Sequence, residues 1–315
     1  MERQSILLSM IKKTLYFGNP AYLSLRSSQL VLNLPDADGM DEKSGRNTIP
    51  IEDIGVIVLD HKQITITHAL IEKLVGNNCA IITCDQSHMP QGLLMPLSGN
   101  SVQGERFAHQ LSSSVPLRKQ LWQQTVKAKI INQAILLKEV QANVNTDNMH
   151  HWASCVTSGD SENHEARAAA YYWGNIFEID NFRRGREEDP PNNLLNYGYA
   201  ILRAIVARSL VASGLLPTVG IHHHNRYNAY CLADDIMEPY RPFVDKVVLN
   251  IIYSGLDYSQ LSKEVKWHLL SIPQADVLIS GKRSPLMVAV SQTTASLYSC
   301  FEGSSRKISY PQFEN

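Results

Sequence analysis

The hydrophobic pattern of this chain changes once, near residue 105, and that change limits what the chain can fold into. Before it, short β-branched runs such as residues 55–60 and 79–85 are separated by turns. From residue 105 to 144, apolar residues recur at the three- and four-residue spacing of a long helix. The pattern predicts an α+β protein, with a β-rich N-terminal domain followed by a larger all-helical C-terminal catalytic domain.

The same signals predict individual elements. We expect strands at 14–20, 22–26, 29–33, 55–60, 79–85 and 92–97, with loops at 35–47 and 181–191. A first helix is expected at 68–75 with Thr67 as its N-cap, and later ones at 105–144, 165–177, 193–213 and 285–298, with a polar break at 150–163. The predicted domains are 1–104 (dimerisation), 105–285 (catalysis) and a C-terminal tail, 286–315.

Composition restricts the kinds of partner. Hydrophobic residues make up 44% of the 315 residues and charged residues 19%, as in a globular protein with a core. The formal net charge is -1, whereas nucleic-acid binders usually carry an excess of Lys and Arg. Any DNA-binding surface must therefore be a local basic patch.

The sequence predicts a cytoplasmic protein with no membrane contact. No apolar run is judged long enough to span a membrane, and no small-residue cleavage site follows the short apolar segment 1–11. The cysteines are odd in number and form no CxxC pair, which indicates reduced thiols. They are Cys79, Cys84, Cys155, Cys231 and Cys300.

Imidazoles and carboxylates crowd into one short region of the second half. Three histidines at 222–224 follow Gly220, and Asp234, Asp235 and Glu238 come about one helix length later. Acids three or four residues apart share one face of a helix and repel one another, so a bound cation would stabilise them. Nitrogen and oxygen ligands together suit a divalent metal of the kind that catalyses phosphodiester chemistry.

A third candidate ligand, Glu165, lies upstream of four alanines whose small side chains allow a second helix to come close. A purely structural role is also compatible with each of these residues. Glu162 and Glu165 suit helix capping, and three consecutive histidines suit a solvated loop. Asp234 is best explained as a solvated helix charge.

Basic residues offer several candidate phosphate contacts. Arg183, Arg184 and Arg186 could hold phosphates, or pair with the acids that follow them at 187–189. Arg226 and Arg241 flank the histidine and acid cluster and are the better candidates. Solvated faces are expected for Lys127, Lys129, Lys138, Lys282, Arg283, Arg306 and Lys307.

Several common catalytic motifs are missing from the sequence. Asp85, Ser87 and His88 lie close together, but triads are assembled from separated segments and no GxSxG elbow is present. There is also no Walker A loop and no GxGxxG. Hydrolysis by a protein nucleophile and nucleotide binding therefore lack support.

Five segments, taken together, match a known family. They are 81–92, with its Cys-Asp-x-x-His-x-Pro-x-Gly pattern, 164–169, 189–199, 220–224 and 235–242. Their order and spacing resemble the CRISPR-associated spacer-acquisition integrase, the first-numbered Cas protein family. The first segment is most similar to the branch that accompanies single-protein effector nucleases, which implies a bacterial source.

The resemblance implies a metal triad of Glu165, His223 and Glu238 that holds Mg²⁺ or Mn²⁺. His223 is favoured because the family's ligand lies three positions after the glycine matching Gly220, and His222 is the next candidate. Asp235 matches a supporting acid near the site. Many members have Gly where this chain has Ala166.

The implied activity is DNA integration in antiviral defence. The 3′-hydroxyl of a short double-stranded fragment attacks a phosphodiester of the CRISPR repeat, and water in its place gives endonuclease activity. The resemblance also implies a homodimer that assembles with the small second-numbered Cas protein, with the effector nuclease as a further partner. The alternatives are a stand-alone metal-dependent repair nuclease and a non-catalytic DNA-binding scaffold.

Overall fold

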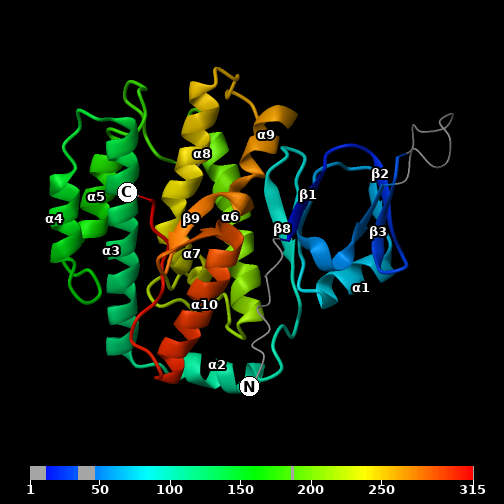
Figure 1. Ribbon diagram of the computed structural model, residues 1–315, viewed down its shortest axis with the longest axis horizontal. Coiled ribbons are helices and arrows are strands. Elements are labelled where there is room, and N and C mark those ends of the chain that lie inside the picture. Colours follow the sequence, from blue (N-terminus) through cyan, green and yellow to red (C-terminus); the bar gives the residue numbers. More distant parts are fainter. Residues whose placement is uncertain (1–11, 35–46, 186–187, 315) are drawn as a thin grey trace, which may run out of the picture.

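The computed structural model describes residues 12–34, 47–185 and 188–314. The chain forms a β-rich part from its first third, with a larger helical part beside it (Figure 1). The predicted α+β class is confirmed. The predictions for segment 1–11, for most of loop 35–47, and for Arg186 and Glu187 fall outside the described residues.

The β-rich part contains two four-stranded sheets. In the first, β1 (Lys13–Phe17), β5 (Ile54–Leu59) and β7 (Ala80–Cys84) run parallel, and β8 (Pro90–Leu94) pairs antiparallel with β7. The second has the order β4 (Asn47–Pro50), β3 (Gln29–Asn33), β2 (Ala21–Arg26), β6 (Ile64–Ile66). Strands β1 and β2 are neighbours in sequence but belong to different sheets.

Strand β5 is apolar on both faces because it separates two cores. Val56 and Val58 face the core of the helical part, whereas Ile54 and Ile57 face a smaller core against helix α1 (His68–Gly76). Side chains alternate across a strand, so a strand covered on both sides needs a continuous β-branched run. The run at 55–60 therefore marks the strand that joins the two parts.

The helical part begins with two helices instead of the single one predicted for 105–144. They are α2 (Gln103–Leu111) and α3 (Val115–Val140). The Ser114 hydroxyl accepts the backbone N–H of Leu117 and starts α3 as an N-cap. The predicted polar break at 150–163 is wrong in its first part, where α4 (Asp147–Cys155) buries Met149 and Ala153 at helical spacing.

The remaining helices follow one another along the second half of the chain. They are α5 (His164–Trp173), α6 (Asn192–Ala212), α7 (Cys231–Met237), α8 (Arg241–Tyr253), α9 (Lys263–Leu269) and α10 (Leu286–Glu302), with 3₁₀ turns η2 (Ile51–Asp53), η3 (Glu238–Tyr240) and η4 (Ile272–Gln274). The segment expected as a tail thus contributes α10, which packs against α6 (Figure 1). The domain boundaries stay a prediction.

The helical part is not all-helical, which corrects the prediction. Strands β9 (Asp276–Ile279) and β10 (Lys282–Pro285) form an antiparallel hairpin. Its two turn residues, Ser280 and Gly281, both have positive φ, at 51° and 76°, as the tight turns of hairpins require. The Ser280-Gly281 pair is the sequence signal that could have predicted this hairpin.

Helix α6 lies at the centre of the main core. By length and composition it could cross a membrane, contrary to our expectation that no run would qualify, but 78% of its most apolar window is buried inside the protein. Gly198 allows its close approach to α8, because a Cβ there would lie 3.3 Å from Ile272 and closer still to Val244. The apolar run of α6 is that of a core helix.

Asn132 ties α3 to the chain on either side of the candidate site. Its buried amide donates to the carbonyl oxygens of Pro239, at 2.8 Å, and Pro311, at 3.0 Å. We expect Asn132→Leu to lower the free energy of unfolding by about 2 kcal/mol, because two buried carbonyls lose their donor. Urea denaturation measures this, and Gln120→Ala, an exposed amide of α3, is the control. Equal stability of both variants would contradict the role of Asn132.

Asp245 joins three helices through buried hydrogen bonds. Its carboxylate accepts the hydroxyls of Tyr172, at 2.8 Å, and Tyr199, at 2.5 Å. Burial raises the pKa of Asp245 from 3.8 to about 6, although both hydroxyls oppose the rise. The folded state therefore binds this proton more tightly than the unfolded state does.

The raised pKa of Asp245 predicts a pH-dependent stability. Relative to Asp245→Asn, the wild type should lose about 3 kcal/mol of unfolding free energy as pH rises from 4 to 7. This loss of unfolding free energy begins as the pH rises above the pKa of Asp245 in the unfolded state. It is complete above the pKa of Asp245 in the folded state, since the buried carboxylate is then charged. Urea denaturation of both proteins at several pH values measures it. A difference that does not change with pH would refute the shift.

Candidate metal centre

The loop that carries the three histidines, residues 220–230, is held by one buried acid. Asp235 of α7 accepts the backbone N–H groups of Ile221, His222 and His223, at 2.7, 3.0 and 3.2 Å. Gly220 permits this close approach, because a Cβ there would clash with the carbonyl oxygen of His223 and lie 2.8 Å from the Asp235 carboxylate. The spacing from Gly220 to the histidines thus reflects a loop folded around a carboxylate.

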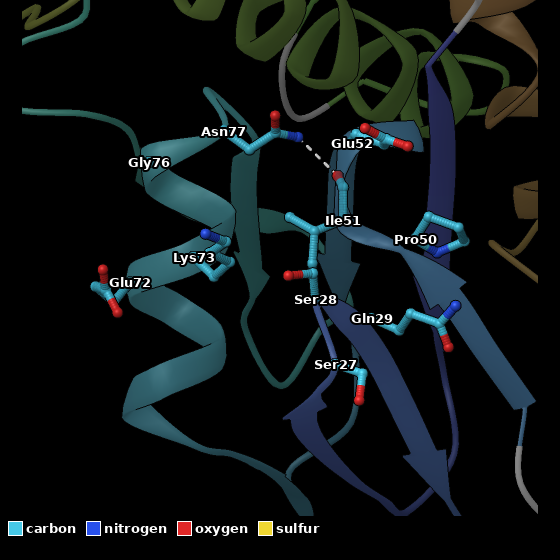
Figure 2. A pocket seen from close by; sticks show the side chains of 10 residues that line it. All are labelled: Ser27, Ser28, Gln29, Pro50, Ile51, Glu52, Glu72, Lys73, Gly76 and Asn77. Atoms are coloured by element: carbon cyan, nitrogen blue, oxygen red, sulfur yellow. Dashed lines mark hydrogen bonds between the residues drawn. The ribbon is translucent and has the colours of Figure 1, made fainter.

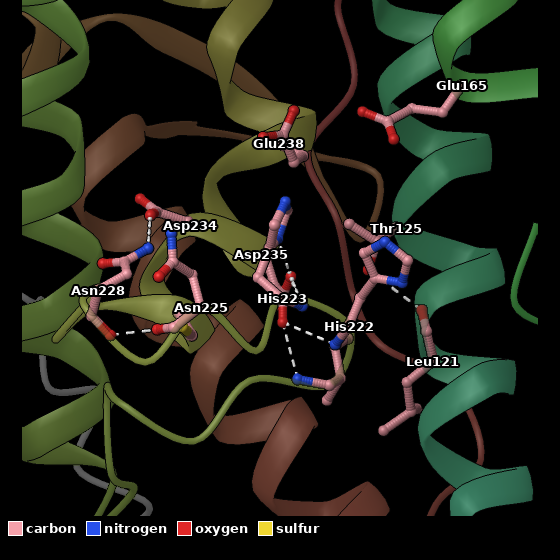
Figure 3. A network of polar contacts seen from close by, with 12 residues as sticks. Leu121, Thr125, Glu165, His222, His223, Asn225, Asn228, Asp234, Asp235 and Glu238 are labelled. Atoms are coloured by element: carbon pink, nitrogen blue, oxygen red, sulfur yellow. Dashed lines mark hydrogen bonds and ion pairs between the residues drawn. The ribbon is translucent and has the colours of Figure 1, made fainter. Parts of the chain in front are cut away.

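Asp235 also orients the ring of His223. Its Oδ1 lies 2.5 Å from Nδ1 of His223, and this hydrogen bond raises the pKa of the imidazole although burial opposes it. The Nε2 side of the ring points toward Glu238 (Figure 3). A histidine that donates Nδ1–H to a carboxylate presents Nε2 as a ligand, which is the usual arrangement of metal-binding histidines.

His222 is placed differently. Its ring stacks on Trp122 of α3 with the centroids 4.1 Å apart and the planes 2° from parallel. Burial lowers the pKa of His222. Of the two histidines, His223 is thus the one whose orientation is fixed by a carboxylate and directed at the acids.

The carboxylate of Glu165 on α5 points toward Glu238 of η3 (Figure 3). The two residues are far apart in sequence, and both carboxylates meet the ammonium of Lys129 from α3, at 2.6 Å each. Lys129 was expected on a solvated face, and that is wrong: its side chain is only 10% exposed. The missed signal is its position, three residues after Val126 and next to Ile130 on the apolar face of the helix.

Glu238 lies in a strongly positive environment. Burial alone would raise its pKa, but Arg241 and Lys129 lower the pKa to about 2. Nε of Arg241 donates to Oε1 at 2.9 Å. The other oxygen, Oε2, pairs with Lys129 but accepts no hydrogen bond of regular geometry from the described residues. Glu238 is therefore charged, and each of its oxygens is paired with one cation.

Asp234 is not the solvated charge that we expected. Its buried carboxylate receives Nε of Arg203 at 2.6 Å and the amide of Asn228 at 2.7 Å. These bonds join α6 to the end of the histidine loop. The prediction was wrong because a sequence pattern does not show which helix packs over a charged face.

The donor set suits Mg²⁺ or Mn²⁺. Two carboxylates and one imidazole are ligands that these cations accept, and Glu238 Oε2 accepts no hydrogen bond of regular geometry from the described residues. In residues 12–34, 47–185 and 188–314, no three acids, histidines or cysteines are grouped closely enough to hold a metal as they stand. Lys129 lies where the two carboxylates meet.

A cleft of about 1010 Å³ opens beside these carboxylates. Lys129, Glu238 and the turn between β7 and β8 contribute to its wall, together with Arg184, Arg203 and Arg241. It therefore brings four cations to a protein whose net charge is near zero. Three acids, Asp85, Glu238 and Asp245, line the same cleft, so its wall carries both charges.

The basic loop contributes to the cleft through Arg184. Its guanidinium donates to the side-chain oxygens of Asn192, at 2.9 Å, and Asn196, at 2.8 Å, and lies over the ring of Tyr199. Within the described part of the chain it makes no ion pair with Glu188 or Asp189, and Glu187, the third acid of the salt-bridging alternative, lies outside the described residues.

The rejected hydrolase motif proves to be structural. Asp85 accepts the backbone N–H groups of Ser87 and Met89, and Nδ1 of His88 lies 2.8 Å from the buried Asp60. Lys266 of α9 pairs with the other oxygen of Asp60 at 2.7 Å. The segment thus links the first sheet to the helical part.

A second hollow, of about 580 Å³, lies over the second sheet (Figure 2). It is formed by the β2–β3 turn, the segment 50–52 and the last turns of α1. Its described lining contains two glutamates and Lys73, but no histidine, and none of the predicted ligands. The chemistry of the sequence motifs therefore belongs to the cleft.

The chain is similar to known proteins over most of its length. The profile of the family described as CRISPR associated protein Cas1 matches residues 15–267. The CRISPR-associated endonuclease Cas1 of Neisseria meningitidis serogroup C is 34% identical over 284 residues, which cover 90% of each chain.

Two solved structures share the fold. A casposase bound to its integration product superposes with a TM-score of 0.74 at 19% identity, covering 94% of this chain and 92% of that one. A chain of a Cas6-RT-Cas1–Cas2 complex gives 0.72 at 21% identity, covering 94% of this chain and 36% of that one. The profile match and the Neisseria relative together show that this chain belongs to the Cas1 family.

Proposed function

We propose that this chain is a metal-dependent DNA integrase and endonuclease that inserts short DNA fragments into a CRISPR array. The observation that carries the proposal is that Glu165 and Glu238 share the Lys129 ammonium, with His223 directed toward Glu238, beside a cleft lined by four cations. The names of two similar proteins agree with it. One is an endonuclease, and the other is a casposase bound to an integration product.

Glu165, His223 and Glu238 would hold Mg²⁺ or Mn²⁺. When bound, the cation supplies positive charge to the phosphate and to the entering and leaving oxygens. Asp235 would accept Nδ1–H of His223 and so direct Nε2 toward the cation, which the neutral imidazole would ligate. Arg241 neutralises one oxygen of Glu238 and holds its carboxylate in place.

The cleft cations would bind the phosphates of the DNA backbone. Arg184 and Arg241 both lie against the ring of Tyr199, whose hydroxyl is held by Asp245. Guanidinium groups fixed in this way lose little entropy when they meet a phosphate. The reacting 3′-hydroxyl belongs to the DNA fragment, so no protein nucleophile is required.

The new bond joins that 3′-oxygen to a phosphorus of the repeat, and the bond from this phosphorus to its own 3′-oxygen breaks. Water in place of the 3′-hydroxyl gives hydrolysis at the same centre. A homodimer and the small second-numbered Cas protein are the proposed partners, and the effector nuclease is a further one. The Cas1–Cas2 complex that shares the fold supports the small partner.

Alanine at Glu165, His223 or Glu238 should reduce integration by about 100-fold or more, since each removes a ligand of the charge-stabilising cation. The assay joins a labelled duplex with free 3′-hydroxyls to supercoiled repeat DNA, with the small partner present. Glu162→Ala, an exposed acid beside the same helix, and His222→Ala are the matched controls. Greater loss with His222→Ala than with His223→Ala would transfer the ligand role to His222.

The products of the same assay separate the candidate functions. Joined products support integration, whereas nicking or degradation alone indicates a stand-alone nuclease. Full activity and unchanged Mn²⁺ binding in all three alanine variants would overturn the assignment of Glu165, His223 and Glu238 as metal ligands.

Gly220→Ala should abolish integration with little loss of the folded state. The added methyl would displace the carbonyl of His223 and the carboxylate of Asp235, and the imidazole would lose its orientation. Gly104→Ala is the control, because a Cβ there meets no atom within 4 Å. Circular dichroism monitors folding, and wild-type activity of Gly220→Ala would contradict the geometry of the loop.

A further inference from the structure

We propose that Lys129 is an exchangeable counterion of the metal centre: its ammonium and the divalent cation compete for the same two carboxylates. The inference rests on the proposed function. It starts from two contacts of 2.6 Å that Lys129 makes with Oε1 of Glu165 and Oε2 of Glu238. No other described side chain makes an ion pair with both acids.

The charges of the cluster make the two cations mutually exclusive. Glu165 and Glu238 carry two negative charges, and Lys129 together with Arg241 already balances them. Like charges a few ångströms apart in a buried site repel strongly. Both oxygens of Glu238 are paired with a cation, so a metal can ligate this carboxylate only when one of the two cations leaves.

Lys129 is the cation that can leave. Arg241 is held by its bond to Glu238, only three residues away on the chain, and by contact with the ring of Tyr199. Lysine has a flexible four-carbon stem and a compact charge with three rotatable donors, whereas the guanidinium of arginine is a planar fork. The structure therefore couples metal entry to a movement of Lys129.

A second position for the ammonium lies one helical turn away. Gln133 is 2% exposed, and its side-chain oxygen is buried without a hydrogen-bond donor in the described structure. Residues four apart on a helix are neighbours on one face, and both Lys129 and Gln133 line the cleft. The unpaired oxygen of Gln133 thus offers an acceptor to the displaced ammonium.

Binding of Mn²⁺, followed by electron paramagnetic resonance in the full-length protein, tests the competition. Lys129→Met should bind Mn²⁺ on the order of tenfold more tightly than the wild type, because the competing charge is gone. Lys129→Arg keeps the charge and should not gain affinity. Lys127→Met, which changes a half-buried lysine of the same helix, should bind as the wild type does.

Thermal unfolding provides a second readout. In chelator, Lys129→Met should unfold at a lower temperature than the wild type, since the buried carboxylate of Glu238 and the half-buried one of Glu165 lose their shared partner. Saturating Mn²⁺ should then raise its unfolding temperature by more than it raises that of the wild type. Lys129→Gln, which keeps a neutral donor, replaces Lys129→Met if the latter does not fold.

A double-mutant cycle tests the role of Gln133. Gln133→Leu should weaken Mn²⁺ binding when Lys129 is present and have little effect in Lys129→Met, so the two changes should not be additive. Additive effects would overturn the second position of the ammonium.

Equal or weaker Mn²⁺ binding by Lys129→Met would overturn the competition, because Lys129 would then only hold the carboxylates in place. Glu238→Ala distinguishes this failure from failure of the proposed function. If Glu238→Ala abolishes Mn²⁺ binding while Lys129→Met gains nothing, only the counterion role is wrong. If Glu238→Ala leaves Mn²⁺ binding unchanged, the metal centre is wrong and the counterion role with it.

Discussion

The candidate site depends on one buried interaction, the double ion pair of Lys129 with Glu165 and Glu238. It joins α3, α5 and η3, three elements that the chain order keeps far apart. The buried carboxylate of Glu238 and the half-buried one of Glu165 could not lie this close together without a cation between them, because their repulsion and desolvation would cost several kcal/mol. One turn along α3, Asn132 binds the backbone at Pro239 and so holds the residue that follows Glu238. Helix α3 thus provides both the charge and the support for the site.

Two buried carboxylates, Asp235 and Asp245, hold residues that form the site. Asp235 holds the backbone of the histidine loop and the ring of His223 together, so loop shape and ring orientation depend on the same carboxylate. Behind the cleft, Asp245 holds Tyr199, and the ring of Tyr199 supports Arg184 and Arg241. Buried polar groups of this kind are stable only when their partners are satisfied. The acids that look interchangeable in the sequence therefore have different roles. Glu238 lines the cleft, Asp235 accepts backbone N–H groups of the histidine loop, and Asp234 pairs with Arg203 of α6.

Much of the fold could be predicted because local patterns dominate it. The strands at β5 and β7, the helix that starts after Thr67 and the long helix α6 occur close to where periodicity placed them. The errors share one cause. Helix α4, the hairpin β9–β10 and the position of α10 in the core depend on what packs against short or polar segments, and such long-range contacts leave little trace in local periodicity. Lys129 and Asp234 were misplaced for the same reason, since their burial depends on partners from other helices.

The sequence by itself determined the two-part organisation, the clustering of acids and histidines after Gly220, and the family to which the chain belongs. These follow from residue type and spacing along the chain. The tertiary structure alone decided which charges meet. In the folded chain Lys129 is buried between Glu165 and Glu238, Asp235 is hydrogen-bonded to His223, and His222 stacks on Trp122. Charge pairing depends on distance in space, and only the packing of α3 against α5 and η3 brings those groups together.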